Sequence, residues 1–562
     1  MKVGEAIARA ISTESSGPIF CLMGDGNIHV LPYSIEVTAT KLIHCRHEAA
    51  AVAMADGFAR LTGDVGVASV TCGPGFTQVA TSLVAARRNR TPLVLLVGDT
   101  PARPNDPAQV IDQSQFASAC EALFQPIERV DTIAEDVRDA FYMARTQRRP
   151  VVLNVPIDLQ LKDLPFEWDY RPSRDFVPAE QRPVPESSAI DLVVSALKTS
   201  NRPLFLAGRG AIGSGAQKEL VAVADAVGAL LGTTLPAKGS FDGHPWNIGI
   251  VGAFCSAPAE RVIALTDLVV GVGAELGHHT TEGGFLFPEA KVIRIDIEAA
   301  PNRIHALSGI YLQGDARETM RAIRERLNSD PRPRIGFRTE DVRAVLDTVP
   351  PPHDPVAANT GINPRELMAA LGPLLPQNCR VICGVGHFWS FAGQYLALRP
   401  DVDISFVHQF SSIGQTLPTA IGGAFADPSR PVVMIEGDGS LMMHIQELDT
   451  AARYAVDLTV LVMNDGALGA EVHKLRAAGH DGQLAVYPSP DFAKITEGMG
   501  GSGVRLDSVA QLEATMRSLP AQRRPFLIDA RISPLVISDP YQRIHFGRES
   551  RAPLQPVLGA RI

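Results

Sequence analysis

Two short polar segments of this chain each follow an apolar run, and a helical pattern separates them. Residues 437–440 (Gly-Asp-Gly-Ser) follow the run 431–436, and residues 464–466 (Asn-Asp-Gly) follow the run 458–463. Each run has the length and composition of a buried strand, whereas apolar residues recur at helical spacing between 440 and 455. Two parallel strands joined by a right-handed helical crossover end at the same edge of a sheet. The pattern therefore predicts a βαβ unit, and with it an α/β fold.

The side chains at this predicted edge suit a divalent cation beside a phosphate group. Asp438 and Asp465 come at the two strand ends, so both carboxylates can face one cation. Hard oxygen ligands of this kind suit Mg²⁺ or Ca²⁺ rather than zinc. Gly437 and Gly439 let the backbone approach a phosphate, and Ser440 falls where a helix N-terminus would offer free N–H groups. We therefore expect a metal and diphosphate site here.

Together the two segments resemble the diphosphate-binding signature of thiamine diphosphate (ThDP) enzymes, whose usual form ends in Asn-Asn. The resemblance implies that ThDP and Mg²⁺ are cofactors. It also implies that the metal ligands are Asp438, Asp465 and the backbone carbonyl of Ala467, and that Leu468 lies at the cofactor. Asp465 replaces the second asparagine of the usual form, which keeps an oxygen ligand and adds a negative charge.

The first part of the chain carries a second portion of the resemblance. Residues 45–60, which begin Cys-Arg-His-Glu-Ala-Ala-Ala, resemble the segment that holds the catalytic glutamate of acetolactate synthases and pyruvate decarboxylases. The resemblance implies that Glu48 hydrogen-bonds the aminopyrimidine ring of the cofactor and promotes its imino tautomer. Without that context Glu48 would be a charge on a helix surface. The strand 65–71, the turn at Gly73 and the helix 76–88 follow the family's order, and Gly73 is assigned to the cofactor.

The length of the chain and two stretches rich in proline and charge predict three domains. A chain of 562 residues is too long for one core, and stretches rich in proline and charge occur at 168–187 and 331–355. The resemblance implies that each domain is a doubly wound parallel α/β sheet. We predict a pyrimidine-binding domain at 1–165, a middle domain at 188–335, a diphosphate-binding domain at 356–540 and a tail at 541–562.

Composition excludes several classes of protein. A net charge of −9 argues against nucleic acid as a partner. No apolar stretch reaches the roughly 18–20 residues of a membrane span, and the N-terminus lacks the apolar core of a signal peptide. The 7 cysteines have no metal-binding spacing and suggest reduced thiols in a cytoplasm. The resemblance further implies a homodimer or homotetramer with each site between two subunits.

The middle domain of some ThDP enzymes binds FAD, but this sequence argues against it. Acetolactate synthases carry an Arg-Phe-Asp-Asp-Arg stretch where residues 273–279 read Gly-Ala-Glu-Leu-Gly-His-His, without arginine. The glycines at 208 and 210 form only a Gly-x-Gly turn. His278 and His279 could suggest a metal, but the sequence offers no third ligand, so we interpret them as surface residues.

On the substrate side, two features resemble pyruvate decarboxylases. Glu471 lies where those enzymes place an acidic residue that assists the loss of carbon dioxide, whereas acetolactate synthases have an apolar residue there. Acetolactate synthases also have a tryptophan where this chain has Lys474. Residues 23–29 (Met-Gly-Asp-Gly-Asn-Ile-His) resemble the Gly-Asp-x-Asn loop of the decarboxylases, in which Asp25 would transfer protons and Asn27 would line the substrate pocket.

Two departures oppose a decarboxylase. Pyruvate decarboxylases carry a His-His pair that is missing from residues 99–103, and aryl 2-oxo acid decarboxylases carry a histidine where this chain has Thr71, another expected pocket residue. His29 could substitute for either histidine, or it could be a surface residue.

Three further positions carry over from the family. Ile413 aligns with the bulky residue that forces the V-shaped conformation of the cofactor. His387 occupies a turn that contacts the diphosphate. Gln113 resembles the family's active-site glutamine, for which Gln115 is the alternative.

The chain is therefore identified as a member of the ThDP enzymes acting on a 2-oxo acid or acyloin. The leading hypothesis is non-oxidative decarboxylation with carboligation, and the alternative is acetolactate-type acyl transfer between two 2-oxo acids. A catalytically silent subunit and a flavin-dependent oxidase of the same fold are further alternatives. The sequence does not name the substrate.

Overall fold

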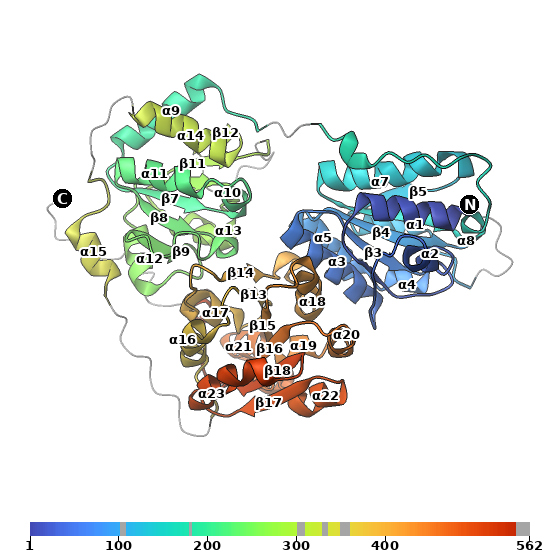
Figure 1. Ribbon diagram of the computed structural model, residues 1–562. Helices are drawn as coiled ribbons and strands as arrows, with labels where there is room; N and C mark the ends of the chain where they lie inside the picture. Colours follow the sequence, from blue (N-terminus) through green and yellow to red (C-terminus); the bar gives the residue numbers. More distant parts are fainter. Residues whose placement is uncertain (102–107, 179–181, 300–308, 329–334, 349–359, 547–562) are drawn as a thin grey trace.

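The computed structural model describes residues 1–101, 108–178, 182–299, 309–328, 335–348 and 360–546. The chain forms three α/β units in sequence order, each around a six-stranded sheet (Figure 1). All neighbouring strands in these sheets are parallel. The prediction of three doubly wound parallel α/β domains is therefore confirmed. Of the predicted tail and second linker, residues 547–562, 331–334 and 349–355 lie outside the described part.

The first sheet has the strand order β2-β1-β3-β4-β6-β5. Alternate residues of its buried strands join two different hydrophobic clusters, one on each face. Helices α1 (Val3–Glu14) and α7 (Ile133–Gln147) cover one face, while α3 (Glu48–Thr62) and α5 (Ala80–Asn89) cover the other. The strands are β1 (Ile19–Cys21), β2 (Leu42–His44), β3 (Gly66–Val70), β4 (Leu93–Asp99), β5 (Leu123–Pro126) and β6 (Pro150–Pro156).

The middle sheet has the order β12-β11-β10-β7-β8-β9. Helices α9 (Ser187–Thr199), α11 (Gln217–Val227) and α14 (Ala316–Asn328) pack on one face, and α12 (Ala257–Ile263) and α15 (Glu340–Leu346) pack on the other. The strands are β7 (Pro203–Ala207), β8 (Leu230–Thr233), β9 (Asn247–Ile250), β10 (Leu268–Val272), β11 (Lys291–Asp296) and β12 (Gly309–Gln313).

The third sheet has the order β14-β13-β15-β16-β18-β17. The chain leaves the adjacent strands β13 and β15 in opposite directions, toward β14 on one side and β16 on the other. Ligands of open α/β sheets bind at the carboxyl ends of strands near such a switch point. The strands are β13 (Arg380–Cys383), β14 (Asp403–Phe406), β15 (Val432–Gly437), β16 (Leu458–Asn464), β17 (Ser502–Leu506) and β18 (Phe526–Arg531).

The first and third units share a continuous apolar core. One cluster contains Phe20 and Leu83 of the first unit together with Ile421 and Leu441 of the third. Helix α18 (Thr416–Ala426) lies directly against α3 (Figure 1). Glycine allows this close approach, because a Cβ at Gly57 would overlap the carbonyl oxygen of Thr419.

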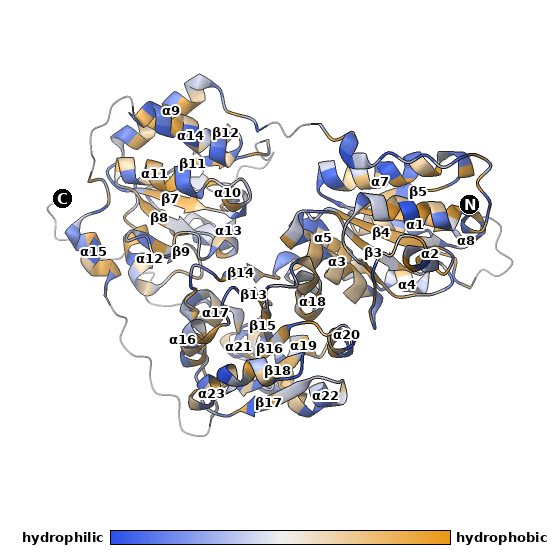
Figure 2. Cartoon of the chain, in the orientation of Figure 1, coloured by the Kyte–Doolittle hydropathy of each residue, from blue (hydrophilic) through white to orange (hydrophobic). Residues whose placement is uncertain are grey.

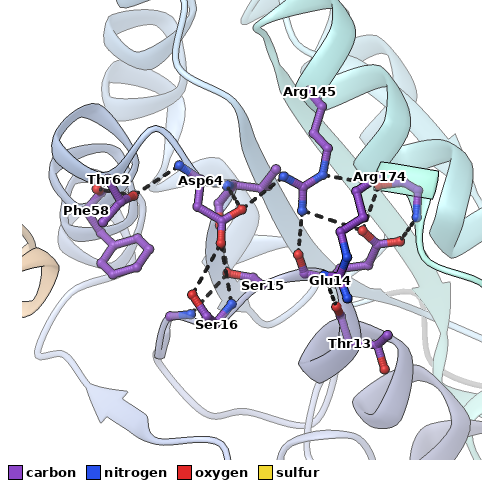
Figure 3. A network of polar contacts seen from close by, with 12 residues as sticks. Thr13, Glu14, Ser15, Ser16, Phe58, Thr62, Asp64, Arg145 and Arg174 are labelled. Atoms are coloured by element: carbon purple, nitrogen blue, oxygen red, sulfur yellow. Dashed lines mark hydrogen bonds and ion pairs between the residues drawn. The ribbon is translucent and has the colours of Figure 1, made fainter. Parts of the chain in front are cut away.

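A segment expected between two domains instead packs on the first unit. The carboxylate of Glu14, which is buried, accepts hydrogen bonds from the Ser173 backbone N–H (2.6 Å) and the Tyr170 hydroxyl (2.7 Å). Figure 3 shows the guanidinium of Arg145 between Glu14 and Asp64, with which it forms ion pairs of 3.6 and 3.0 Å. Residues 170–173 are therefore bound to helix α1 of the first unit.

Hydropathy follows the layers of the fold. Hydrophobic residues concentrate along the strands and the helix faces that cover them, and hydrophilic residues lie on the outer helix faces (Figure 2). Among the helices that the structure describes, none combines the length and hydropathy that crossing a bilayer requires.

Candidate active site

The two acidic residues predicted to share a cation lie at one edge of the third sheet. Strands β15 and β16 pair in parallel, with Gly437 opposite Met463, so Asp438 and Asp465 follow at neighbouring strand ends. The Ser489 hydroxyl lies 2.6 Å from Asp438 Oδ2, to which it donates. The Ala467 N–H donates to Asp465 Oδ1 at 3.2 Å. The structure thus brings the predicted ligand residues together.

The electrostatics of this pair fit a bound cation. Burial, followed by the charge of Asp438, raises the pKa of Asp465 to about 8. Burial also raises the pKa of Asp438. Two buried carboxylates disfavour each other's ionisation, and a divalent cation between them removes this cost. Among the described residues, no three His, Cys, Asp or Glu side chains are placed so that they could hold a metal ion, so a third protein ligand would be a backbone oxygen such as that of Ala467.

Beside these acids the backbone forms a narrow cradle. A Cβ at Gly439 would lie 2.8 Å from Leu468 Cδ2, and one at Gly437 would lie 3.0 Å from the Phe388 ring. Helix α19 (Asp438–Leu441) begins at the same place, with Ser440 buried. Glycine therefore keeps open the approach to the backbone that a diphosphate requires, and the residues here fit ThDP with Mg²⁺.

The loop before α18 carries Ile413 to the edge of this cradle. Phe410 (φ 64°) and Ser411 (φ 53°) both adopt the left-handed conformation, which is costly for residues other than glycine. Gly414 holds the end of the loop, because its N–H donates to Ser440 Oγ at 2.7 Å. Such strain persists only where surrounding contacts impose it, as is common at functional sites.

Glu48 is the first residue of α3 and faces a turn of the first unit. Its Oε1 atom would lie 3.4 Å from a Cβ on Gly75, and Thr71 Cγ2 would lie 2.6 Å from the same Cβ. Gly73 adopts φ 52°, which favours glycine. The structure thus groups Glu48, Thr71 and the turn at Gly73, as the sequence predicts.

The third unit holds the segment that precedes Glu48. The Arg46 N–H donates to Glu447 Oε1 at 3.0 Å, and the His44 N–H donates to the Tyr454 hydroxyl at 2.9 Å. The rings of His47 and His444 have centroids 5.6 Å apart. Within this chain the segment that precedes Glu48 therefore lies against the third unit, which also carries the cradle.

Glu471 and Lys474 pair with each other on the surface. They lie one turn apart on α21 (Gly469–Ala477), and their side chains form an ion pair of 2.9 Å. Their side chains are 50% and 43% exposed. At half exposure the Glu471 carboxylate is in contact with solvent as well as with Lys474.

The loop at residues 23–29 has one fully enclosed side chain. Asn27 accepts from the Gly24 N–H (2.9 Å) and donates to Leu22 O (3.1 Å) and Ser69 Oγ (3.0 Å). Its amide is thus fully used inside the protein, so Asn27 shapes the loop rather than facing a pocket. The Gly26 N–H donates to Thr71 Oγ1 at 3.0 Å, which brings the loop to the Thr71 corner.

The two acid–base candidates of this loop differ in position. Asp25 is exposed, and its charge contributes to the raised pKa of Cys72, after burial as the main cause. It therefore lies near the turn that Glu48 faces. The His29 backbone packs against Gly4 of α1, and its side chain is half-buried.

Gln113 supports the turn at Gly73 from behind. It is buried, its Nε2 donates to Asn154 Oδ1 (2.7 Å) and Gly98 O (3.0 Å), and its Oε1 accepts from the Gly73 N–H (3.3 Å). Both N–H groups of this amide are therefore used inside the protein. Gln115, the alternative, is exposed, and its N–H caps α6 (Gln113–Ala119) through Asp112.

Sequence reasoning missed Gln109. This exposed residue lies beside the turn, where its Oε1 accepts from Cys72 Sγ at 3.2 Å, and a Cβ at Gly73 would overlap its carbonyl oxygen. The sequence feature that could have pointed to Gln109 is its position four residues before Gln113, in the segment that leads into α6.

His387 lies in a buried ring cluster behind the cradle. Its Nε2 accepts from the Ser538 N–H at 3.0 Å, and its ring centroid lies 4.4 Å from that of His473 and 4.8 Å from that of Tyr541. Burial holds its pKa well below the usual range. The neutral ring therefore carries its proton on Nδ1, which is left as a donor.

Family models match each of the three units. A thiamine pyrophosphate enzyme N-terminal TPP-binding domain matches residues 1–118, a thiamine pyrophosphate enzyme central domain matches 190–323, and a thiamine pyrophosphate enzyme C-terminal TPP-binding domain matches 384–530. Glu48 lies in the first matched region, and Asp438 and Asp465 lie in the third.

Similar curated proteins extend over nearly the whole chain. A probable acetolactate synthase large subunit of Methanocaldococcus jannaschii is 28% identical, over 95% of this chain and 92% of the relative. The acetolactate synthase isozyme 3 large subunit of Escherichia coli is 26% identical, over 92% of each chain. An acetolactate synthase of Arthrospira platensis is 29% identical, over 87% of this chain and 86% of the relative.

Proposed function

This chain belongs to the thiamine pyrophosphate enzymes, and we propose that it joins two 2-oxo acids in an acetolactate synthase-type reaction. In this reaction the first 2-oxo acid loses its carboxyl group as carbon dioxide. Its former carbonyl carbon then forms a bond to the keto carbon of the second acid, giving a 2-hydroxy-3-oxo acid. One carbon dioxide is released for each product, and no oxidant is required.

The observation that carries this proposal is that the segment before Glu48 is held against the third unit, which carries the cradle. The Glu48 segment is fastened to the third unit through Arg46 and Glu447, next to the loop that presents Ile413. The proposed proton-transfer group, the strained loop and the proposed metal ligands would thus form one site at the switch point of the third sheet. This combination supports carbanion chemistry rather than simple ligand binding.

Each group has a role in the proposed site. Asp438, Asp465 and the Ala467 carbonyl would hold Mg²⁺, and the backbone at Gly437 and Gly439 would approach the diphosphate. ThDP, when bound, supplies the carbanion that attacks a carbonyl and accepts the electrons left by carbon dioxide. Glu48 would exchange a proton with the aminopyrimidine ring, and Ile413 would fix the conformation of the cofactor.

Two observations favour the synthase over a simple decarboxylase. The similar proteins named above are acetolactate synthases. In addition, Glu471, which the decarboxylase hypothesis assigns to protonation, is half-exposed and paired with Lys474. We therefore assign Glu471 and Lys474 to the rim of the site that receives the second acid.

We also propose that the enzyme is a cytoplasmic homodimer or homotetramer. All 7 cysteines are unpaired and buried, which supports a reducing compartment. Exposed apolar side chains next to the cradle, Met442 and Met443, and Phe410 of the strained loop, support a second subunit over this face. Sedimentation across a concentration series tests the oligomer.

The proposed reaction is tested with the purified protein, ThDP, Mg²⁺ and a panel of ¹³C-labelled 2-oxo acids, alone and in pairs. NMR follows carbon dioxide, aldehyde, acyloin and 2-hydroxy-3-oxo acid together. We expect one 2-hydroxy-3-oxo acid for each carbon dioxide released. Release of one aldehyde for each carbon dioxide would instead support a decarboxylase. If no 2-oxo acid released carbon dioxide, both the synthase and the decarboxylase hypotheses would be refuted.

A further inference from the structure

His444 lies between the two halves of the candidate site, and none of the roles assigned above includes it. It follows α19 in the third unit and is 6% exposed. Its Nδ1 lies 2.8 Å from Gly414 O. Because a carbonyl oxygen can only accept, Nδ1 is the donor. Burial, followed by the nearby His47, lowers the pKa of His444 to about 4. The ring is therefore neutral, with its proton on Nδ1.

The facing ring, His47, has the complementary arrangement. His47 is the N-cap of α3, and its Nδ1 accepts from the Ala49 N–H at 3.1 Å. When the ring is neutral, its proton is therefore on Nε2. The two rings meet edge to face, with centroids 5.6 Å apart and an interplanar angle of 89°. Such a geometry is favourable for aromatic rings.

These contacts connect the two residues that define the reacting centre. Gly414 directly follows Ile413, and both of its backbone polar groups are held, the N–H by Ser440 and the carbonyl by His444. His47 directly precedes Glu48 and caps its helix. The His444 ring thus contacts the loop that contains Ile413 through a hydrogen bond, and it contacts the N-cap of the Glu48 helix by packing against His47.

We propose that His444 is a positioning residue that fixes the loop at Ile413 and Gly414 relative to the helix that begins at Glu48. Glu48 and Ile413 come from different units, so their relative position is not set by either sheet alone. The His444 ring supplies a direct link between them. The role of the two residues in catalysis rests on the proposed function, whereas the mechanical link itself does not.

The contacts of His444 can be removed without separating the first unit from the third. The Glu48 segment keeps its hydrogen bonds to Glu447 and Tyr454, and α3 keeps its contact with α18. Substitution of His444 should therefore loosen two short segments and leave the three sheets intact. His444→Ala removes both contacts, whereas His444→Asn retains an N–H donor for Gly414 O and removes the ring that meets His47.

Hydrogen–deuterium exchange of the apoprotein, read by mass spectrometry, tests the link without any cofactor or substrate. In His444→Ala we expect exchange to rise about tenfold at residues 411–416, the effect of one lost hydrogen bond, and by up to about tenfold at residues 47–52, the effect of the lost ring contact. In His444→Asn exchange should rise at 47–52 only. Lys494→Ala, at a side chain that is 80% exposed on α22 (Phe492–Gly498), should change neither segment.

A change confined to 411–416 in His444→Ala would overturn the proposal, because His444 would then hold only its own loop. Unchanged exchange in both segments would overturn it as well. Protection across the strands of all three sheets serves as the control for folding. If His444→Ala unfolds, His444→Asn alone decides, since its predicted effect is limited to 47–52.

The turnover rate of the His444 variants provides a second test of the positioning role. With ThDP and Mg²⁺ present, His444→Ala should lower kcat about tenfold and change the Kd for ThDP less than threefold, because positioning acts on reaction rather than on the diphosphate. An equal loss of ThDP affinity would contradict positioning. If the wild-type protein were inactive but the two His444 variants showed the predicted exchange pattern, the proposed function would be refuted. The structural role of His444 would still be supported.

Discussion

Asp438 and Asp465, 27 positions apart in the sequence, end neighbouring parallel strands and face each other at one buried edge of the third sheet. Each disfavours ionisation of the other, and the pKa of Asp465 is about 8 as a result of burial and of the Asp438 charge. This arrangement is unfavourable for the protein alone and favourable with a divalent cation, so it predicts both pH dependence and the effect of substitution.

Mg²⁺ binding should release a proton below pH 8. The carboxylate of Asp465 must be ionised to bind the metal, so the apparent affinity should fall by up to about tenfold for each pH unit between 8 and 6. Titration calorimetry in buffers of different ionisation enthalpy measures both the number of protons released and the apparent affinity for Mg²⁺. Because the folded apoprotein binds this proton more tightly than the unfolded chain, its stability should fall as pH rises from about 4 to 8.

The two acids should respond differently to substitution. Asp438→Ala should lose metal-dependent ThDP binding, because it removes a charged oxygen ligand. Asp465→Asn should retain binding, since the amide keeps an oxygen and relieves the repulsion, and the proton release described above should disappear. Fluorescence titration of ThDP with and without Mg²⁺ compares them. Equal losses of affinity would refute the assignment of the ligands.

Loss of the Glu471–Lys474 ion pair on α21 should affect binding of the second (acceptor) 2-oxo acid more than decarboxylation of the first. If Glu471 and Lys474 form the rim of the acceptor site, Glu471→Gln should raise the KM for the acceptor about threefold to tenfold and leave the rate of carbon dioxide release unchanged. Steady-state kinetics with two different 2-oxo acids separates the two parameters. Slower aldehyde release with more acyloin would instead support Glu471 as the proton donor of a decarboxylase.

Close packing of α3 on α18 should make Gly57 intolerant of a side chain. A Cβ there would overlap the Thr419 carbonyl oxygen, so Gly57→Ala should destabilise the protein by about 1–3 kcal/mol. Gly213→Ala is the matched control, because a Cβ at Gly213 meets nothing within 4 Å and should change stability by no more than about 0.5 kcal/mol. Urea unfolding measures both, and equal midpoints would contradict the packing.

The sequence predicts those features that depend on backbone periodicity. Buried parallel strands leave continuous apolar runs, so three sheets could be expected, and parallel strand ends meet at one edge, so Asp438 and Asp465 could be placed together. The position of Glu48 at the start of a helix could be predicted from its neighbours in the same way.

Side chains in loops were harder to assign, because their partners are distant in sequence. Asn27 is satisfied by Ser69, and Gln113 by Asn154, 42 and 41 positions away. No local pattern reveals that these amides are already used, so both were assigned to the site. The ion pair of Glu471 with Lys474 has a local signal, their spacing of three on a helix, and could have been predicted from it.

The central claim is that Glu48 transfers a proton within a ThDP site, and Glu48→Gln tests it most directly. Turnover of the best 2-oxo acid and the Kd for ThDP are measured on the same preparation. Turnover should fall at least about 100-fold with ThDP still bound, since acid–base groups contribute about 10²–10⁴-fold. Retention of more than about a tenth of the wild-type rate would contradict the claim.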